Sequence, residues 1–305
     1  MTAIGFDTSN YTTSIAAFWG KDGVNCSRLL PVKQGELGLR QSDALFSHIK
    51  SLPELADRLF SHVRKSDISM VGVSTRPRAV EGSYMPCFLA GICQARTLAA
   101  ALRVPLAEVS HQQGHIAASL WSAGRMELMD EPHLAWHLSG GTTELLLVEP
   151  EGKNVKCTCI GGTSDISAGQ LIDRTGQLLG LQFPAGKGLD ALSREAMGKD
   201  LFKVKCMDFA FSLSGVENKV RQYYEKNRNP AETAGYALRC VVHAVKTATC
   251  HAQKAYPGLQ VVFSGGVASN EMLRQQMLDC IFCPPEFATD NAMGVAVLAR
   301  RIMEG

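Results

Sequence analysis

The stretch Val261-Val-Phe-Ser-Gly-Gly-Val-Ala-Ser-Asn270 decides the fold of this chain. An apolar run leads into Ser264 and two glycines, which predicts a buried strand, a tight turn and a helix that begins near Asn270 or Glu271. Glycine lets a backbone approach a ligand closely, and a helix N-terminus offers free N–H groups to an anion or a polar ring. The stretch therefore has the features of a turn that contacts a ligand.

Two further stretches repeat this pattern. Leu134-Ala-Trp-His-Leu-Ser-Gly-Gly-Thr-Thr-Glu-Leu-Leu-Leu-Val148 is typical of a strand, a glycine turn and a second strand. Ala3-Ile-Gly-Phe-Asp-Thr-Ser-Asn-Tyr-Thr-Thr-Ser-Ile-Ala-Ala17 predicts a hairpin that turns at residues 8–11. Three such turns, on strands from both halves of the chain, predict an α/β protein in which two similar domains hold a nucleotide in a cleft between them. The polar segment Gly124 to Pro132 is the predicted boundary.

The composition is that of a globular protein with room for two domains. The chain has 305 residues, of which 46% are hydrophobic and 20% are charged. Its net charge of +2 excludes a global basic field for nucleic acid, while a local RNA-binding face stays open. The most apolar stretch, residues 88–106, contains Gln94, Arg96 and Arg103, so we expect no membrane span. The N-terminus has no signal-type segment and the ten cysteines are scattered, so we expect a cytoplasmic protein with reduced thiols.

A pair of histidines is the first candidate metal site. His111 and His115 are four residues apart in a segment that Ser110 is suited to cap as a helix. On a helix they share one face, so they either bind one metal ion or line a cleft. Gln112 follows the first histidine and cannot act as a general base, which excludes a zinc protease of the His-Glu-x-x-His type.

Two carboxylates near the ends of the chain are further candidates for ligand binding. Asp7 ends the first predicted strand and precedes several hydroxyl residues. It either holds a phosphate-bound metal, accepts a hydrogen bond, or stabilises the hairpin turn in the way Asp side chains commonly do. Asp290 lies just before an apolar C-terminal helix, where it either caps that helix or serves as a third metal ligand.

Two further carboxylates accompany glycine-rich segments in the second half. Asp173 lies on a predicted helix for which Ser164 or Asp165 is the expected cap. Asp190 closes the loop Phe183-Pro-Ala-Gly-Lys-Gly-Leu-Asp190, where it either binds ribose hydroxyls or caps the helix that follows.

Taken together, these motifs resemble the TsaD family of tRNA threonylcarbamoyladenosine transferases, once catalogued as glycoproteases. The resemblance runs nearly end to end, with the motifs in the family's order. Each motif alone is weak, whereas the ordered set is specific. The matching segments are Asp7-Thr-Ser9, Val73-Ser-Thr-Arg-Pro77, His111-x-x-x-His115, Ser139-Gly-Gly-Thr-Thr143, Ile166-Ser-Ala-Gly-Gln-Leu-Ile-Asp173, Phe211-Ser-Leu-Ser-Gly215, Ser264-Gly-Gly-Val-Ala-Ser-Asn270 and Thr289-Asp-Asn-Ala292.

The resemblance implies an ASKHA fold (the actin, sugar kinase and Hsp70 class) with two duplicated ribonuclease-H-like domains and an interdomain cleft. The first domain would be residues 1–130, completed by a C-terminal helix within 287–305, and the second, nucleotide-binding domain would be residues 131–286. The family binds one divalent metal, iron or zinc, through residues that match His111, His115 and Asp290. Some members add an aromatic hydroxyl where this chain has His137, and imidazole is also a competent ligand.

The resemblance also implies an activity. Members transfer the threonylcarbamoyl group from threonylcarbamoyl-AMP to N6 of adenosine 37 in ANN-decoding tRNAs, with a metal acting as Lewis acid. The implied partners are tRNA, TsaB-like and TsaE-like proteins and a separate enzyme that makes the adenylate; a homodimer is left open. The residues that would bind the adenylate or an ATP- or AMP-type nucleotide are Asp7, Leu138, Ser139, Gly140, Gly141, Thr142, Asp173, Gly186, Asp190, Gly265, Gly266 and Asn270.

The chain departs from the usual family motifs at several places. Arg76-Pro-Arg78 stands for Gly-Pro-Gly, Thr142 stands for His or Asn, and Gln112-Gln113 stands for Met/Leu-Glu. Two alternatives therefore stay open: a divergent relative that transfers a carbamoyl or acyl group to another acceptor, and a non-catalytic, nucleotide-binding scaffold. A sugar kinase is the nearest rival at the level of fold, but it would not need the histidine pair.

Overall fold

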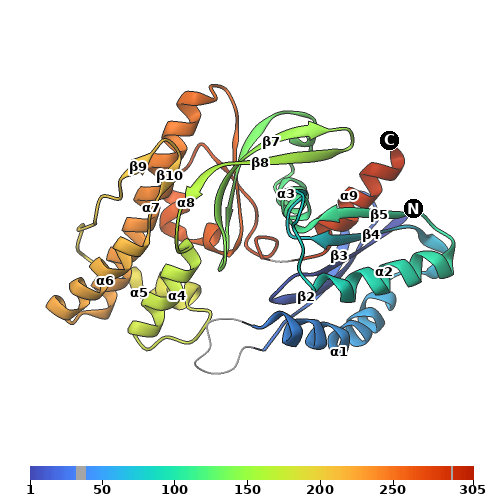
Figure 1. Cartoon of the computed structure of the whole chain (residues 1–305), viewed down its shortest axis with the longest axis horizontal. Helices are drawn as coiled ribbons and strands as arrows, with labels where there is room; N and C mark the ends of the chain where they lie inside the picture. Colours follow the sequence, from blue (N-terminus) through green and yellow to red (C-terminus); the bar gives the residue numbers. More distant parts are fainter. Residues whose placement is uncertain (32–38, 290) are drawn as a thin grey trace. The chain divides into compact units, whose positions relative to one another are not determined.

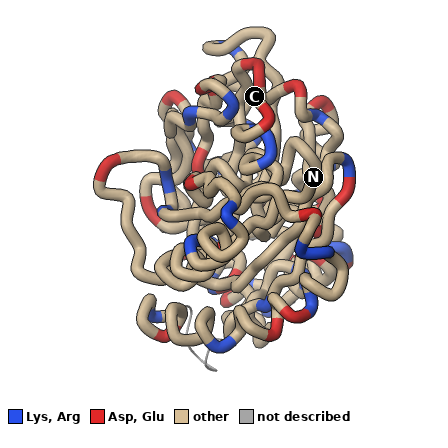
Figure 2. Tube along the Cα trace, turned by 90° about the vertical axis from the view of Figure 1, so that its right-hand side faces the viewer, with Lys and Arg blue, Asp and Glu red and all other residues tan. Residues whose placement is uncertain are grey.

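The computed structural model describes residues 1–31, 39–289 and 291–305. The chain divides into two compact units, each with its own sheet. Unit 1 comprises Met1–Pro132, Val148–Cys157 and Asp290–Gly305, and unit 2 comprises His133–Leu147 and Thr158–Thr289. No helix in the described ranges is both long enough and apolar enough to cross a membrane. Lysine and arginine are interspersed with acidic residues over the trace (Figure 2), and the net charge of the sequence is +2.

Unit 1 is built on a five-stranded sheet in the order β3-β2-β1-β4-β5 (Figure 1). The first three strands are antiparallel neighbours, which confirms the predicted hairpin, while β4 runs parallel to both β1 and β5. All seven residues of β1 are buried, as befits a central strand covered on both faces. The strands are β1 Thr2–Thr8, β2 Thr12–Phe18, β3 Gly23–Leu29, β4 Ile68–Arg76 and β5 Leu106–Ser110.

Helices cover both faces of this sheet. On one face, Ile4 and Phe6 pack with leucines of α1 and alanines of α2 in a single core. On the other face, Gly5 and Gly72 leave only enough room for α9, whose backbone and alanines lie against them. Figure 1 shows α9 on the side of the sheet opposite α1. The helices of unit 1 are α1 Gln41–Phe60, α2 Phe88–Leu102, α3 His111–Ser122 and α9 Met293–Glu304, with short 3₁₀ turns η1 Lys65–Asp67 and η2 Met126–Asp130.

Unit 2 repeats this topology. Its strands β8-β7-β6-β11-β12 follow the same order as β3-β2-β1-β4-β5, and β11 runs parallel to β6 and β12. A long helix, α7, packs over Trp136 and Phe263 in the core of the unit. The mixed α/β prediction is therefore confirmed. The strands are β6 His133–Leu138, β7 Thr143–Glu151, β8 Asn154–Thr163, β9 Cys206–Met207, β10 Ala210–Phe211, β11 Val261–Ser264 and β12 Ile281–Phe282; the helices are α4 Ala168–Leu178, α5 Gly186–Ser193, α6 Ser214–Asn227, α7 Pro230–Ala255 and α8 Glu271–Gln276, with the 3₁₀ turn η3 Gly266–Ser269.

The predicted cap of α4 was wrong. The helix begins at Ala168, and its cap is Ser167, whose hydroxyl accepts from the Gln170 N–H while the Gln170 side chain accepts from the Ser167 N–H. Asp165 instead accepts hydrogen bonds from Ser212, Leu213 and Ser214 at the start of α6. Burial alone would raise the pKa of Asp165, but these donors outweigh it and hold the pKa well below its usual range.

A buried histidine, His48, makes the stability of the protein depend on pH. His48 lies on α1 with no exposed surface, its Nδ1 is 2.8 Å from Thr13 Oγ1, and its Nε2 has no hydrogen-bond partner among the described residues. Burial lowers the pKa of His48 from 6.5, although the Ser9 backbone and the Asp7 charge act in the opposite direction. The folded chain therefore takes up this proton only at a lower pH than the unfolded chain does.

We expect the free energy of unfolding to fall as the pH drops below about 6.5, by up to about 1.4 kcal/mol per pH unit from this histidine. Below that pH the unfolded chain is stabilised by protonation and the folded chain is not, until the lowered pKa of His48 is reached. Urea unfolding of wild type and His48→Gln between pH 7.5 and 5 measures the effect. The wild-type curve should be steeper in this window, and parallel curves would contradict the assignment.

Candidate functional site

The predicted histidine pair forms on the first turns of α3. Ser110 caps this helix as expected: its hydroxyl accepts from the Gln113 N–H at 3.2 Å, and the Gln113 side chain accepts from the Ser110 N–H at 2.8 Å. The Gln113 amide also donates to the Val155 carbonyl at 2.7 Å, which fixes the helix to the segment Val148–Cys157 of unit 1. The rigid start of α3 brings the Nε2 atoms of His111 and His115 within 3.0 Å of each other.

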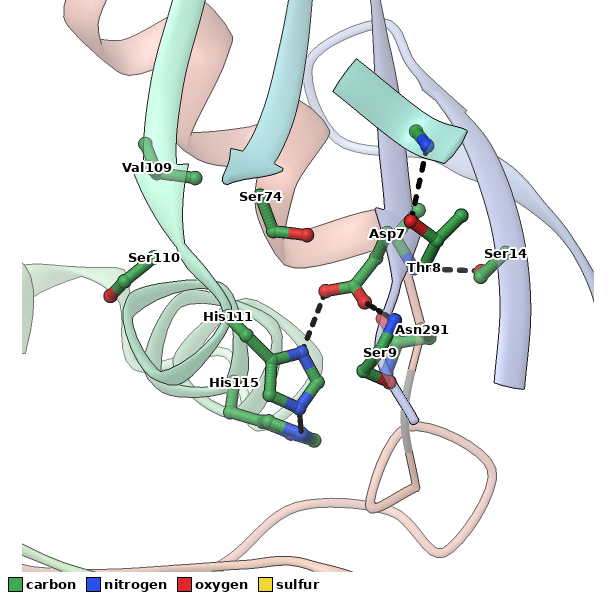
Figure 3. Close-up of polar contacts among 12 residues, drawn as sticks. Asp7, Thr8, Ser9, Ser14, Ser74, Val109, Ser110, His111, His115 and Asn291 are labelled. Atoms are coloured by element: carbon green, nitrogen blue, oxygen red, sulfur yellow. Dashed lines mark hydrogen bonds and ion pairs between the residues drawn. The ribbon is translucent and has the colours of Figure 1, made fainter. Parts of the chain in front are cut away.

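Asp7 meets this pair from the end of β1. Its Oδ2 lies 2.7 Å from His111 Nδ1, and its Oδ1 accepts from the Ser9 N–H at 3.0 Å. The Asp7 side chain is only 2% exposed, and that of His111 is 17% exposed. Figure 3 shows the carboxylate pointing at the His111 ring, and that ring at His115. A contact between residues 104 positions apart was not apparent from the sequence pattern.

The two imidazoles are spaced for a shared metal ion. Nitrogen ligands at about 2.0–2.1 Å from one ion lie roughly 2.9–3.4 Å apart, and the observed separation of the two Nε2 atoms is 3.0 Å. Within residues 1–31, 39–289 and 291–305, no group of three histidine, cysteine or acidic side chains is arranged to hold a metal. Asp290, the third implied ligand, lies outside the described residues. His137 is buried on β6 in unit 2, and its role as a ligand stays a prediction.

In unit 2, the first glycine turn is held by the start of α4. The turn closes through the Ser139 N–H, which donates to the Thr142 carbonyl at 2.8 Å. The Ser167 hydroxyl donates to the Gly140 carbonyl at 2.6 Å. A Cβ on Gly169 would lie 2.4 Å from the Ser139 carbonyl oxygen, so only glycine permits this close approach of helix and turn.

The second glycine turn packs directly against the first. β6 and β11 are parallel, with His137 opposite Ser264, so their carboxyl ends meet at one edge of the sheet. Gly265 has a φ of +89°, and a Cβ there would lie 2.2 Å from the Leu138 carbonyl oxygen. Both glycine turns are thus backbone loops in contact, as expected of two sides of one binding site.

Asp190 and Asn270 join this group. Asn270 caps α8, since its Oδ1 accepts from the Leu273 N–H at 2.9 Å, and its amide donates to Asp190 Oδ1 at 2.5 Å. Asp190 lies inside α5, so its predicted alternative as a helix cap is wrong. Asp173 accepts from the Ala185 N–H at 2.8 Å, directly before Gly186 and the start of α5. Burial raises the pKa of both carboxyls, as is common for groups at binding sites.

Four glycines of this group have no close neighbour on the side where a side chain would stand. A Cβ built on Gly140, Gly141 or Gly186 would meet nothing within 4 Å, and one on Gly266 would meet only Thr289, at 3.8 Å. A side chain at these four positions would therefore be unobstructed or nearly so, and the contact of the unit 2 residues with a nucleotide stays a prediction. Asp7 contacts His111 in unit 1 instead, and its predicted contact with the substrate stays a prediction. Sequence reasoning missed Ser167, although its spacing to Gln170 is a capping-box signal.

The comparisons with known proteins agree on one family. A family model described as "TsaD: tRNA N6-adenosine threonylcarbamoyltransferase" matches residues 38–297. A protein of that name from Kosmotoga olearia is 33% identical over 264 residues, which are 81% of this chain and 75% of its own. Another, from a Sulfurihydrogenibium species, is 29% identical over 315 residues, which are 97% of this chain and 89% of its own.

Solved structures share the fold at low sequence identity. Full-length HypF in its phosphate- and nucleotide-bound form has a TM-score of 0.63 and 16% identity, covering all of this chain and 47% of that one. A ROK family glucokinase from Streptomyces griseus, in complex with glucose and AMPPNP, has a TM-score of 0.55 and 10% identity over the full length of both chains. These neighbours have the expected ASKHA-type fold. With this fold and the family match across most of its length, the chain belongs to the TsaD family of tRNA N6-adenosine threonylcarbamoyltransferases.

Proposed function

We propose that the chain transfers the threonylcarbamoyl group from threonylcarbamoyl-AMP to N6 of adenosine 37 in ANN-decoding tRNAs. The observation that carries the proposal is the convergence of His111 and His115 at 3.0 Å in a chain of this family. A scaffold that performs no chemistry would not need two converging imidazoles beside a buried carboxylate.

His111 and His115 would hold the metal, iron or zinc, together with Asp290 of the same unit. The metal, when bound, supplies a Lewis acid for the carbamoyl end of the donor. The imidazoles fit this role because their Nε2 atoms point to a common place while the backbone of α3 is fixed by its capping box.

The two glycine turns of unit 2 would bind the adenylate. Gly140, Gly141 and Gly266 offer backbone N–H groups without side chains, which suits close contact with phosphate or a planar base. Asp190 and Asn270 form a fixed polar pair beside them, able to hold ribose hydroxyls. Their mutual hydrogen bond orients both side chains before the ligand arrives, which lowers the entropic cost of binding.

The organisation of the chain and its partners follow the same proposal. Units 1 and 2 would be the two ribonuclease-H-like domains, as the repeated strand order supports. tRNA would be the acceptor in the cytoplasm, with TsaB-like and TsaE-like proteins as partners and a separate enzyme supplying the adenylate. A second copy of the chain is a further candidate partner.

The proposal is tested by measuring metal content and tRNA modification on the same anaerobically purified samples. Wild type should contain near one equivalent of iron or zinc and modify tRNA when supplied with threonylcarbamoyl-AMP and the partner proteins. His111→Ala should lose the metal and at least about 100-fold of the activity. His62→Ala removes an exposed histidine of the same unit and should behave as wild type.

Two outcomes would contradict the proposal. If wild type contains no metal, and its activity does not rise when iron or zinc is added, the histidine pair does not hold a metal for this reaction. Metal-loaded protein that consumes threonylcarbamoyl-AMP but modifies a different acceptor would move the assignment to a carbamoyl or acyl transferase of other specificity.

A further inference from the structure

We propose that Asp7 is a positioning residue for the metal site: its carboxylate fixes the His111 ring in the tautomer whose Nε2 lone pair faces the Nε2 of His115. The inference rests on the proposed metal at the histidine pair. It assigns a specific task to Asp7, near the end of β1, which the proposed chemistry does not otherwise use.

The tautomer follows from the hydrogen-bond inventory of the contact. An ionised carboxylate only accepts hydrogen bonds, so the His111 Nδ1 that lies 2.7 Å from Asp7 Oδ2 must be the donor. A neutral imidazole that is protonated on Nδ1 has an unprotonated Nε2 with a lone pair. In the metal-free chain the His115 Nε2–H can donate to this lone pair across 3.0 Å. The same lone pair is what a metal ion requires.

The carboxylate is itself held in place. Asp7 Oδ1 accepts from the Ser9 N–H, so the second oxygen is left to face His111 (Figure 3). The neighbouring Thr8 ties the end of β1 to α2, since its hydroxyl donates to the Cys87 carbonyl at 3.0 Å and accepts from the Gly91 N–H at 3.1 Å. Asp7 therefore cannot turn away from His111 without breaking the end of a fully buried strand.

The charge of Asp7 also favours a cation at this place. Its side chain is 2% exposed, and among the described residues it forms no ion pair with lysine or arginine. A buried carboxylate without a cationic partner is costly, because desolvation is not offset by attraction. A metal ion on the far nitrogen of His111 would supply positive charge one imidazole ring away, in the carboxylate–histidine–metal arrangement that is common in proteins.

The first test reads the tautomer without any metal. In apo wild type with ¹⁵N-labelled histidine, the imidazole nitrogen resonances of His111 should report a protonated Nδ1 and a bare Nε2. In Asp7→Asn the amide oxygen accepts from the Ser9 N–H, as Asp7 Oδ1 does in wild type. The NH₂ group then takes the place of Oδ2 and faces His111. The ring should then become an acceptor at Nδ1 and carry its proton on Nε2. A wild-type His111 protonated on Nε2 would overturn the proposal, and this measurement needs no variant to fold.

The second test reads metal affinity by titrating Zn²⁺ or Co²⁺ into the apo proteins. We expect Asp7→Asn to bind about 10–100-fold more weakly than wild type. Asp67→Asn is the matched control: it makes the same chemical change at a carboxylate of unit 1 that pairs with Arg64, so its metal affinity should stay within about threefold of wild type. Equal affinities of Asp7→Asn and wild type would overturn the role of Asp7. A wild type that binds no metal would refute the proposed metal site. The ¹⁵N measurement of the His111 tautomer would still test the role of Asp7.

Discussion

Gly294→Ala is expected to lower the free energy of unfolding by about 3 kcal/mol, the upper end of what overpacking commonly costs. A Cβ at this position would lie 1.8 Å from the Gly114 carbonyl oxygen and 2.7 Å from the Ala118 nitrogen. Both atoms belong to the backbone of α3, so no side chain can move aside to relieve the clash. Since small proteins are stable by only about 5–15 kcal/mol in total, a loss of this size removes a large share of the stability.

The same substitution should also displace His111 and His115 and so weaken metal binding. Gly114 lies between His111 and His115, so a helix pushed away from α9 at this crossing moves both imidazoles. Urea unfolding measures the stability, and metal titration measures the site. Gly215→Ala is the control: a Cβ there meets nothing within 4 Å, and alanine is favoured over glycine in a helix, so stability should stay or rise. Equal stability of Gly294→Ala and wild type would show that α3 and α9 are not packed as described.

The sequence predicted those parts of the site that depend on local pattern. The strand Val261–Ser264, the glycine turn after it and the histidines on one helix face follow from the periodicity and spacing of nearby residues. The capping of α3 by Ser110 is equally local, because donor and acceptor lie within one turn.

The parts that escaped prediction depend on residues far apart in the chain. Asp165 has the chemistry of a cap for α4, but its carboxylate accepts hydrogen bonds from Ser212 and Ser214, which lie 47 and 49 positions later. The hydrogen bond from Asn270 to Asp190 spans 80 positions, and that from His111 to Asp7 spans 104. Such contacts depend on the tertiary fold, which brings strand ends together, and a short stretch of sequence does not show them.

Gln113 stands where the family motif usually has glutamate, and its hydrogen bonds explain why glutamine fits here. A glutamate at this position can accept from the Ser110 N–H as glutamine does, but an ionised carboxylate cannot donate to the Val155 carbonyl. The amide therefore satisfies both groups in a buried place where an unmet carbonyl would be costly. The replacement of Glu by Gln in this motif thus fits the packing of α3 in unit 1, and it leaves the two histidines untouched.

Gly186→Leu is expected to weaken binding of AMP or threonylcarbamoyl-AMP at least about 10-fold while leaving the fold intact. Gly186 is the first residue of α5, and a Cβ on it meets nothing within 4 Å. Leucine is favoured over glycine in helices by about 0.5–1 kcal/mol, so the free energy of unfolding should stay or rise. The same side chain would occupy the space that the glycines of unit 2 leave open beside Asp190, where we place the nucleotide.

Stability and affinity should therefore change in opposite directions, which separates a blocked site from a damaged fold. Calorimetric titration with AMP and urea unfolding of the same samples measure the two quantities. Gly215→Leu places the same side chain near the start of α6, again in open space, and should leave nucleotide affinity unchanged. If Gly186→Leu binds nucleotide as tightly as wild type, the ligand does not lie at the start of α5, and the two glycine turns would have to hold it from another side.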